Sequence, residues 1–324
     1  MKTFQSLNRA YNTVFQAGRL SLGLVVPIEN YAHGAVPTMA DHLKRIRLAE
    51  QLGYRAAWVR DVPFNVPSFG DAGQTFDPFT YLGYLAGQTE NIALGVSSIA
   101  LPLHHPVHVA KSAATIDQLS GGRMLLGIAS GDRPQEYPAM NLDFTARAEH
   151  FREAFTYLRA AQESFPQLAD NHFGTLDGTV DILPKPTAGK LPLLMTGYSR
   201  QTLAWNAEHA DGWMNYPRSV QEQGYTVAEW RRLVAQFGEH DKPFMQPLYV
   251  ILEQDDDFKP RPIQLGMRTG TKYLLEYLND LERVGVNHVA INLRFSPNTE
   301  WSMEQLAEKV LPQFHFNNQP LPTP

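Results

Sequence analysis

The sequence predicts an α/β protein of the (β/α)8 TIM-barrel class. Short apolar runs alternate along the chain with longer amphipathic segments, which together make eight strand–helix units. Repeated strand–helix units are typical of a parallel sheet, and eight of them favour a closed barrel over an open doubly wound sheet. The open sheet stays the alternative, although its G-x-G-x-x-G fingerprint is missing after the first expected strand.

The expected strands are short apolar runs, and the expected helices carry apolar residues at spacings of three and four. The strands are residues 20–26, 55–60, 92–99, 124–129, 193–196, 212–216, 244–252 and 288–293. The helices are residues 39–52, 78–88, 109–119, 149–161, 201–209, 220–237, 272–284 and 303–314. Gly53 follows the first helix as a C′ glycine would. After the fourth helix, residues 172–183 contain Gly174 and Gly178 and predict a short β-hairpin insertion.

Composition limits the classes of function. None of the 324 residues is a cysteine, which excludes disulfide scaffolds, thiolate metal sites and cysteine nucleophiles. The balance of 28 basic and 33 acidic residues argues against a nucleic-acid partner. The chain shows no membrane-spanning run and no signal-peptide pattern, so we expect a cytoplasmic protein. We expect one domain over residues 1–324, with an N-terminal arm at 1–18 and a loose tail at 317–324.

Catalytic groups of a (β/α)8 barrel lie at the C-terminal ends of its strands. Asp61 directly follows the second expected strand and is a candidate acid or base if burial tunes its pKa. The alternative is an aspartate that only binds a backbone N–H. The third strand is followed by His104, His105 and His108, which project in different directions and have no carboxylate nearby in the sequence. We therefore predict no metal site and take His104 as the second candidate catalytic residue.

A second candidate site is the turn Thr196-Gly197-Tyr198-Ser199-Arg200, which joins a strand to a helix. Gly197 allows close approach of the backbone, and Ser199 is placed to cap the following helix. Free N–H groups at such a turn, together with the charge of Arg200, predict an anion site. The alternative is a plain serine N-cap without a ligand.

Residues 94–132 carry a longer pattern that resembles the bacterial luciferase-like flavin-dependent monooxygenase family. The matching motifs lie in and after the third expected strand and run to the end of the fourth. They are Leu101-Pro102, His105-Pro106, Ile116 to Ser120, Gly122-Arg123 and Gly127 to Gly131. Further stretches that match the family cover most of residues 20–300. The fold of that family is a (β/α)8 barrel with an insertion, which agrees with the pattern of strands and helices.

The resemblance implies reduced FMN bound at the C-terminal rim of the barrel. It implies that the phosphate lies on the turn at residues 197–200 and that the flavin ring lies against the ends of the third and fourth strands. The implied cofactor-binding residues are Ser97, Ser98, Ala129, Ser130, Tyr137, Gly197, Tyr198, Ser199 and Arg200. The family position of Ser97-Ser98 often carries a cis peptide, which we predict here. Asp117 and Arg123 also match motif positions, and we interpret both as structural.

This chain departs from luciferase just after the second strand, where luciferase has a catalytic histidine pair. Asp61-Val62-Pro63 stands there instead, so the luciferase base is not carried over. The resemblance implies a two-component monooxygenase that uses O2 and a small organic substrate, with reduced FMN supplied by a separate, transiently bound flavin reductase. The alternatives are a deazaflavin-dependent hydride-transfer enzyme of the same fold and a non-catalytic flavin-binding relative.

We also expect a homodimer. Members of the resembled family commonly pair through early barrel helices. Residues 81–87 place aromatic or apolar side chains on nearly every face of their expected helix, and an exposed apolar face often marks an interface. The alternative is that the loop at 63–77 or the N-terminal arm at 4–17 covers this helix within one chain.

Overall fold

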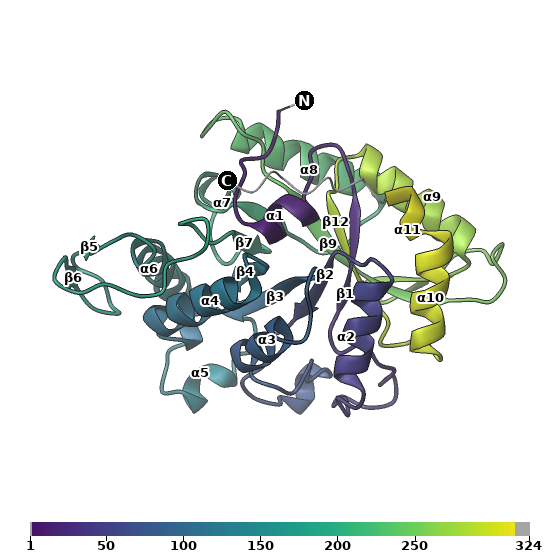
Figure 1. Cartoon of the computed structure of the whole chain (residues 1–324), viewed down its shortest axis with the longest axis horizontal. Coiled ribbons are helices and arrows are strands. Elements are labelled where there is room, and N and C mark those ends of the chain that lie inside the picture. The colour runs from purple at the N-terminus through teal and green to yellow at the C-terminus, as the bar shows by residue number, and fades with distance from the viewer. Residues whose placement is uncertain (1, 315–324) are drawn as a thin grey trace.

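Eight parallel strands close into a barrel in the computed structural model, which describes residues 2–314 (Figure 1). The barrel strands follow one another in chain order, and β12 returns to pair with β1. The pairing of β8 with β9 completes the ring. They are β1 Ser21–Val25, β2 Ala56–Val59, β3 Ala93–Ala100, β4 Met124–Ala129, β7 Leu193–Thr196, β8 Gly212–Met214, β9 Phe244–Leu252 and β12 His288–Asn292. The predicted closed barrel is confirmed, and the open sheet is wrong.

Helices surround this barrel on the outside. They are α2 His42–Gln51, α3 Pro78–Ala86, α4 Pro106–Ser120, α6 Arg147–Ala160, α7 Leu203–His209, α8 Val220–Val234, α9 Thr271–Arg283, α10 Thr299–Lys309 and α11 Leu311–Phe314. The last two replace one expected helix, because Pro312 lacks an N–H and its ring clashes with the carbonyl four residues before it. Within residues 2–314, no helix is both long and apolar enough to cross a membrane.

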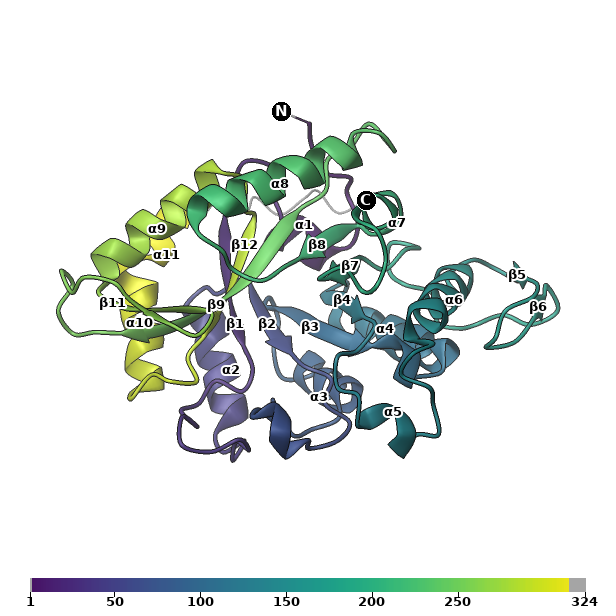
Figure 2. The same cartoon turned by 180° about the vertical axis from the view of Figure 1, so that it is seen from behind.

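Two hairpins interrupt the regular pattern. The expected insertion is present as β5 Gln167–Leu168 paired antiparallel with β6 Leu176–Asp177, which begins earlier than predicted. Figure 2 shows this hairpin beyond α6, at the side of the molecule. A second hairpin, β10 Arg261–Ile263 and β11 Gly266–Thr269, extends from β9 and was not predicted. Its strands are short and largely exposed to solvent, so the sequence there has no apolar alternation to reveal them.

The N-terminal segment forms a short helix, α1 Arg9–Val14, that packs against residues filling the barrel interior. The hydroxyl of Tyr11 donates to the carbonyl of Asp211 at 2.8 Å. The side-chain amide of Asn8 donates to Asp117 at 2.8 Å, which explains the buried position of that carboxylate. Arg123 donates to four acceptors between the end of α3 and the start of β3, and to the carbonyl of Ser120 at the end of α4. Asp117 and Arg123 are therefore structural, as predicted.

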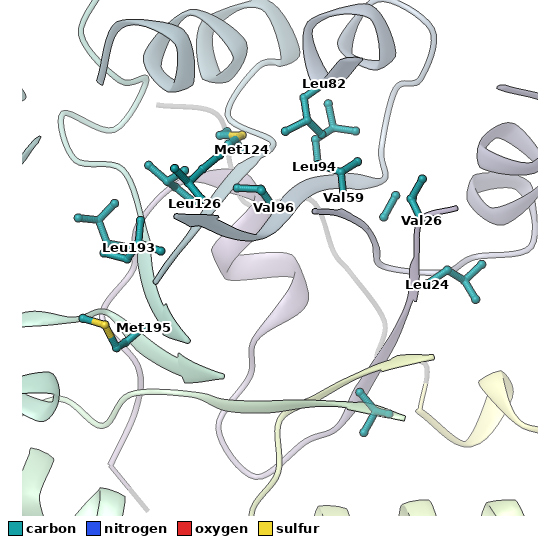
Figure 3. Packing of buried hydrophobic residues seen from close by; sticks show 14 of the residues in the cluster. Leu24, Val26, Val59, Leu82, Leu94, Val96, Met124, Leu126, Leu193 and Met195 are labelled. Carbon is teal, nitrogen blue, oxygen red and sulfur yellow. The ribbon is translucent and has the colours of Figure 1, made fainter. Parts of the chain in front are cut away.

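The core consists of two layers on either side of the barrel wall. Strand residues that point outward pack beneath the helices, and Figure 3 shows Leu82 of α3 beside Leu94 of β3. Strand residues that point inward, Trp58 and Leu125 among them, fill the barrel itself. Both faces of the parallel strands are buried, which explains their continuous apolar runs.

Gly127 in β4 has no space for a side chain. A Cβ there would lie 2.2 Å from the carbonyl oxygen of Val96 and 2.7 Å from Met214 Cε. We expect Gly127→Ala to lower the free energy of unfolding by about 1–3 kcal/mol. Gly83 in the interior of α3 is the control, because its Cβ would meet nothing within 4 Å. Gly83→Ala should stabilise the protein by about 0.5–1 kcal/mol. Urea unfolding of both variants checks the difference, and equal effects would contradict it.

Most of α3 is covered within one chain. Tyr81, Leu82 and Leu85 are buried, and the rings of His42 and Phe76 pack against Tyr81. Tyr84 remains 46% exposed. Part of the apolar surface that suggested an interface is thus covered by α2 and by the loop before α3. The homodimer stays a prediction and now depends mainly on the family resemblance.

Candidate functional site

A cavity of about 490 Å³ opens at the C-terminal ends of the barrel strands. Its wall includes the ends of β2, β3, β4, β7 and β8 and parts of the loops that follow them. Predicted site residues in the wall are Asp61, Ser97, Ser98, Ala129, Ser130, Gly197, Tyr198, Ser199 and Arg200. The structure therefore brings most of the predicted site residues together around one cavity, although they come from four strands.

One end of the cavity is the turn between β7 and α7. Gly197, Ser199 and Arg200 all adopt positive φ angles, of 56°, 47° and 60°. The carbonyl of Gly197 is held by Trp213 Nε1 at 2.7 Å. Among residues 2–314, the backbone N–H groups of Tyr198, Ser199 and Arg200 have no acceptor. Successive free N–H groups in such a turn form a concave site for anions.

Ser199 is not the N-cap of the following helix, and this prediction was wrong. An N-cap residue has an extended conformation, whereas Ser199 is left-handed, and its hydroxyl donates to the carbonyl of Thr196 at 2.9 Å. Thr202 caps α7 instead and accepts from the N–H of Trp205. The helix therefore begins at Leu203, two residues later than the expected start at residue 201.

Arg147 completes this end of the cavity and was not among the predicted site residues. Its Nη1 donates to the carbonyl of Phe144 at 2.5 Å, and its guanidinium lies 3.5 Å from the centre of the Phe144 ring. Its Nε is buried without a partner in the described residues. Burial, followed by the positive charge of Arg200, lowers the pKa of Arg147. Two arginines in one cavity wall, beside free N–H groups, favour an anion at this end of the cavity.

Asp61 and His104 form a hydrogen-bonded pair beside the ends of β2 and β3. Asp61 Oδ2 accepts from His104 Nε2 at 2.7 Å and from the N–H of Ala100 at 3.0 Å. The side chain of Asp61 is 2% exposed and that of His104 is 26% exposed. Asp61 is part of the cavity wall, whereas His104 contacts Asp61 from outside that wall.

The pair holds a proton more firmly than a free histidine does. Burial lowers the pKa of His104, but the hydrogen bond and the charge of Asp61 outweigh burial, so the net pKa is raised. Asp77 and Glu136 act in the same direction. Asp61 thus binds a backbone N–H, as the alternative expected, and its role as a catalytic acid or base stays a prediction.

The other two histidines of the run do not join this pair. His105 caps α4 by accepting from the N–H of Val107, and its Nε2 lies 3.0 Å from the carbonyl of Phe173. The ring of His108 lies beside that of His105. Within the described ranges, no three histidine, aspartate or glutamate side chains are grouped as metal ligands.

The remaining predicted positions lie at the ends of β3 and β4. The peptide bond between Ser97 and Ser98 is cis, as predicted. Tyr137 belongs to the short helix α5 Glu136–Ala139 and is fully buried, and its hydroxyl donates to the carbonyl of Ser130. It is not part of the cavity wall. The expected direct contact of Tyr137 with a cofactor is corrected, because this ring supports Ser130 from behind.

Comparisons with known proteins agree with this geometry. The model of the luciferase-like monooxygenase family matches residues 20–292. An uncharacterised protein of Mycobacterium tuberculosis is 32% identical over 190 residues, which cover 54% of this chain and 67% of that protein. The alkanal monooxygenase beta chain of Photorhabdus luminescens is 36% identical over 93 residues, which cover 29% of each chain.

Solved structures show the same fold at low identity. A monooxygenase from Streptomyces bottropensis has a TM-score of 0.76 with 17% identity, over 91% of this chain and all of that chain. An F420-dependent secondary alcohol dehydrogenase has a TM-score of 0.75 with 17% identity, over 92% of this chain and all of that chain. The sequence match over most of the barrel, together with this shared architecture, shows that the chain belongs to the luciferase-like monooxygenase family.

Proposed function

We propose that this chain is a flavin-dependent oxidoreductase, and specifically the oxygenating component of a two-component monooxygenase that uses reduced FMN and O2 on a small organic substrate. The observation that supports it most is the composition of the cavity. One end offers two arginines and free backbone N–H groups to an anion, and the wall near β2 includes Asp61, which His104 contacts from behind that wall. A separate flavin reductase is proposed as the transient partner.

The residues present fit a flavin phosphate. The turn at 197–200 presents free N–H groups, and the buried Nε of Arg147 lacks an acceptor that a phosphate oxygen would provide. A cavity of about 490 Å³ is within the range for cofactor-sized ligands. Ser97, Ser98, Ala129 and Ser130 form the part of the wall proposed to face the ring. A bound flavin would supply the redox chemistry, which no protein side chain here provides.

The protein's own contribution is to bind, orient and manage protons. Arg147 and Arg200 would fix the phosphate and so set the position of the rest of the cofactor along the cavity. Asp61 Oδ2 accepts hydrogen bonds from His104 and Ala100 at the cavity wall. Asp61 would take a proton from a group bound in the cavity and share that proton with His104 through their hydrogen bond. Tyr137 would keep the carbonyl of Ser130, and thereby the end of β4, in place.

The experiment that tests this proposal is a titration of the pure protein with oxidised FMN, reduced FMN and a deazaflavin, followed by flavin absorbance and fluorescence. We expect reduced FMN to bind tightest and its oxidation by O2 to respond to added organic substrates. Tightest binding of the deazaflavin would replace this proposal with hydride transfer without oxygen. FMN binding with no redox response to any organic compound would favour a non-catalytic flavin-binding protein.

A further inference from the structure

A second group of arginines borders the cavity near the end of β2. Arg60 and Arg133 both form part of the cavity wall. Arg60 Nη1 lies 3.0 Å from Asp71 Oδ2, and Arg294 Nη1 lies 3.0 Å from the same oxygen. Arg133 Nη2 donates to the backbone carbonyl of Asp71 at 3.1 Å. One aspartate in the loop before α3 is thus shared by three guanidinium groups.

The nearby acceptors do not satisfy these arginines. Arg133 Nη1 lies 3.7 Å from Glu136 Oε1, which is beyond hydrogen-bond distance. Neither of these two atoms, nor Arg60 Nη2, has a hydrogen-bond partner in residues 2–314, although all three are buried. Leaving a buried charged donor without an acceptor is costly, so a protein retains such an arrangement where a ligand completes it.

Acidic side chains lie in the same wall as Arg133, namely Asp61, Asp132 and Glu136. Glu136 forms an ion pair with Arg133 at 3.7 Å, and burial raises the pKa of Glu136 although Arg133 acts in the opposite direction. Asp132 makes no hydrogen bond or ion pair with Arg133, and its charge acts on Arg133 only at longer range. The guanidinium of Arg133 is held over the ring of Phe69, 4.2 Å from its centre, so its plane is fixed before any ligand arrives.

We propose that Arg133, assisted by Arg60, binds a carboxylate group of the organic substrate, so that this enzyme acts on an organic acid. Arg60 and Arg133 each bring a guanidinium group to the cavity wall, and two guanidinium groups can bind the two oxygens of one carboxylate. Val62, Phe69 and Tyr216 border the same region and provide apolar and aromatic surface for the rest of such a substrate. This proposal rests on the proposed function only in calling the ligand a substrate.

The test compares a carboxylate with two neutral probes that carry the same aromatic ring. The protein is saturated with FMN, and binding of benzoate, benzamide and benzyl alcohol is measured at pH 7 by saturation-transfer NMR and calorimetry. A carboxylate held by two arginines should bind at least about tenfold more tightly than either neutral probe. Equal binding of the three probes, or no detectable binding of benzoate, would overturn the proposal.

Variants assign that preference to a residue. Arg133→Met keeps the apolar stem over Phe69 and should reduce benzoate affinity to that of benzamide, with little change for benzamide itself. Arg133→Lys should retain part of the preference, because it keeps the charge but loses the paired donors. Arg294→Met is the matched control, since Arg294 also pairs with Asp71 but is not part of the cavity wall. The control should keep the full preference for benzoate.

The two methionine variants decide whether Arg133 carries the preference for benzoate. A preference that persists in Arg133→Met, or one that is lost equally in Arg294→Met, would overturn the assignment to Arg133. The titration is repeated without FMN in inorganic phosphate, which competes for the Arg147–Arg200 end. This experiment separates the two proposals. If the protein fails to bind FMN but still prefers benzoate through Arg133, the proposed cofactor is wrong and the carboxylate site stands.

Discussion

Combined replacement of Arg147 by methionine and Arg200 by alanine should weaken FMN binding by a factor of about 100 or more, while riboflavin binding changes little. Hydrogen bonds to a charged group contribute about 1.5–3 kcal/mol, and each 1.4 kcal/mol is about tenfold in affinity. FMN and riboflavin differ only in the phosphate, so the difference between them isolates the interaction with these arginines. Methionine at position 147 keeps the apolar contact with Phe144.

Fluorescence quenching of both flavins by the wild type, each single variant and the double variant provides the measurement. Arg200→Ala alone should already separate FMN from riboflavin. Arg232 on α8 is exposed and pairs with Glu229, so Arg232→Ala removes the same charge far from the cavity and should leave both affinities unchanged. If FMN and riboflavin weakened equally in the double variant, the phosphate assignment would be wrong.

Asp61→Asn should lower oxygen-dependent turnover of reduced FMN by about 100-fold, with FMN affinity changed less than about threefold. A positioned acid–base group typically contributes about 100- to 10,000-fold, and asparagine keeps the shape of the side chain but cannot accept the proton. An oxygen electrode measures turnover. His108→Gln is the control, because His108 belongs to the same segment but has no bond to Asp61. Equal activity in Asp61→Asn and the wild type would refute a catalytic role for Asp61.

Asp61→Asn should also change the pKa of His104 and, with it, the pH dependence of stability. Asp61 raises the pKa of His104, so the protonated pair persists above the ordinary pKa of histidine. The stability that the pair contributes is fully present below the pKa of the unfolded chain and is lost as the pH rises through the raised folded value. In Asp61→Asn the pKa of His104 should fall, because burial then acts without the opposing carboxylate. NMR titration of the imidazole checks the direction, and an unchanged pKa would contradict it.

The barrel could be predicted because its strands are buried on both faces. Their apolar runs are continuous, and the bounds of β4, β7 and β9 agree with the expected residues 124–129, 193–196 and 244–252. The turn at 197–200 could also be located, since a glycine between a strand and a helix marks a tight connection. The exact cap could not, because nothing in the local sequence indicates that Ser199 is left-handed and donates to Thr196, or that the distant Trp213 holds the carbonyl of Gly197.

Side chains that reach the cavity from elsewhere were harder to find. Arg147 lies on α6, well after the end of β4, and nothing in the local sequence distinguishes it from the exposed arginines of that helix. The only signal was its place at the end of a stretch that resembles the family. Arg133 lies in the irregular connection after β4, and Glu136 begins the four-residue helix α5, which is too short for periodicity to indicate which side chains are buried. His104, the partner of Asp61, could be predicted because it follows β3 and the ends of neighbouring strands meet at one rim of the barrel.

The most direct test of the proposed site is a crystal structure of the protein with FMN bound. The proposed site requires the phosphate to lie between Arg147 and Arg200, within hydrogen-bond distance of the free N–H groups at residues 198–200. It also requires the flavin ring to lie against Ser97 and Ser98, with Asp61 at the edge of the same cavity. A flavin that binds elsewhere, or one whose phosphate points into solvent away from both arginines, would contradict it.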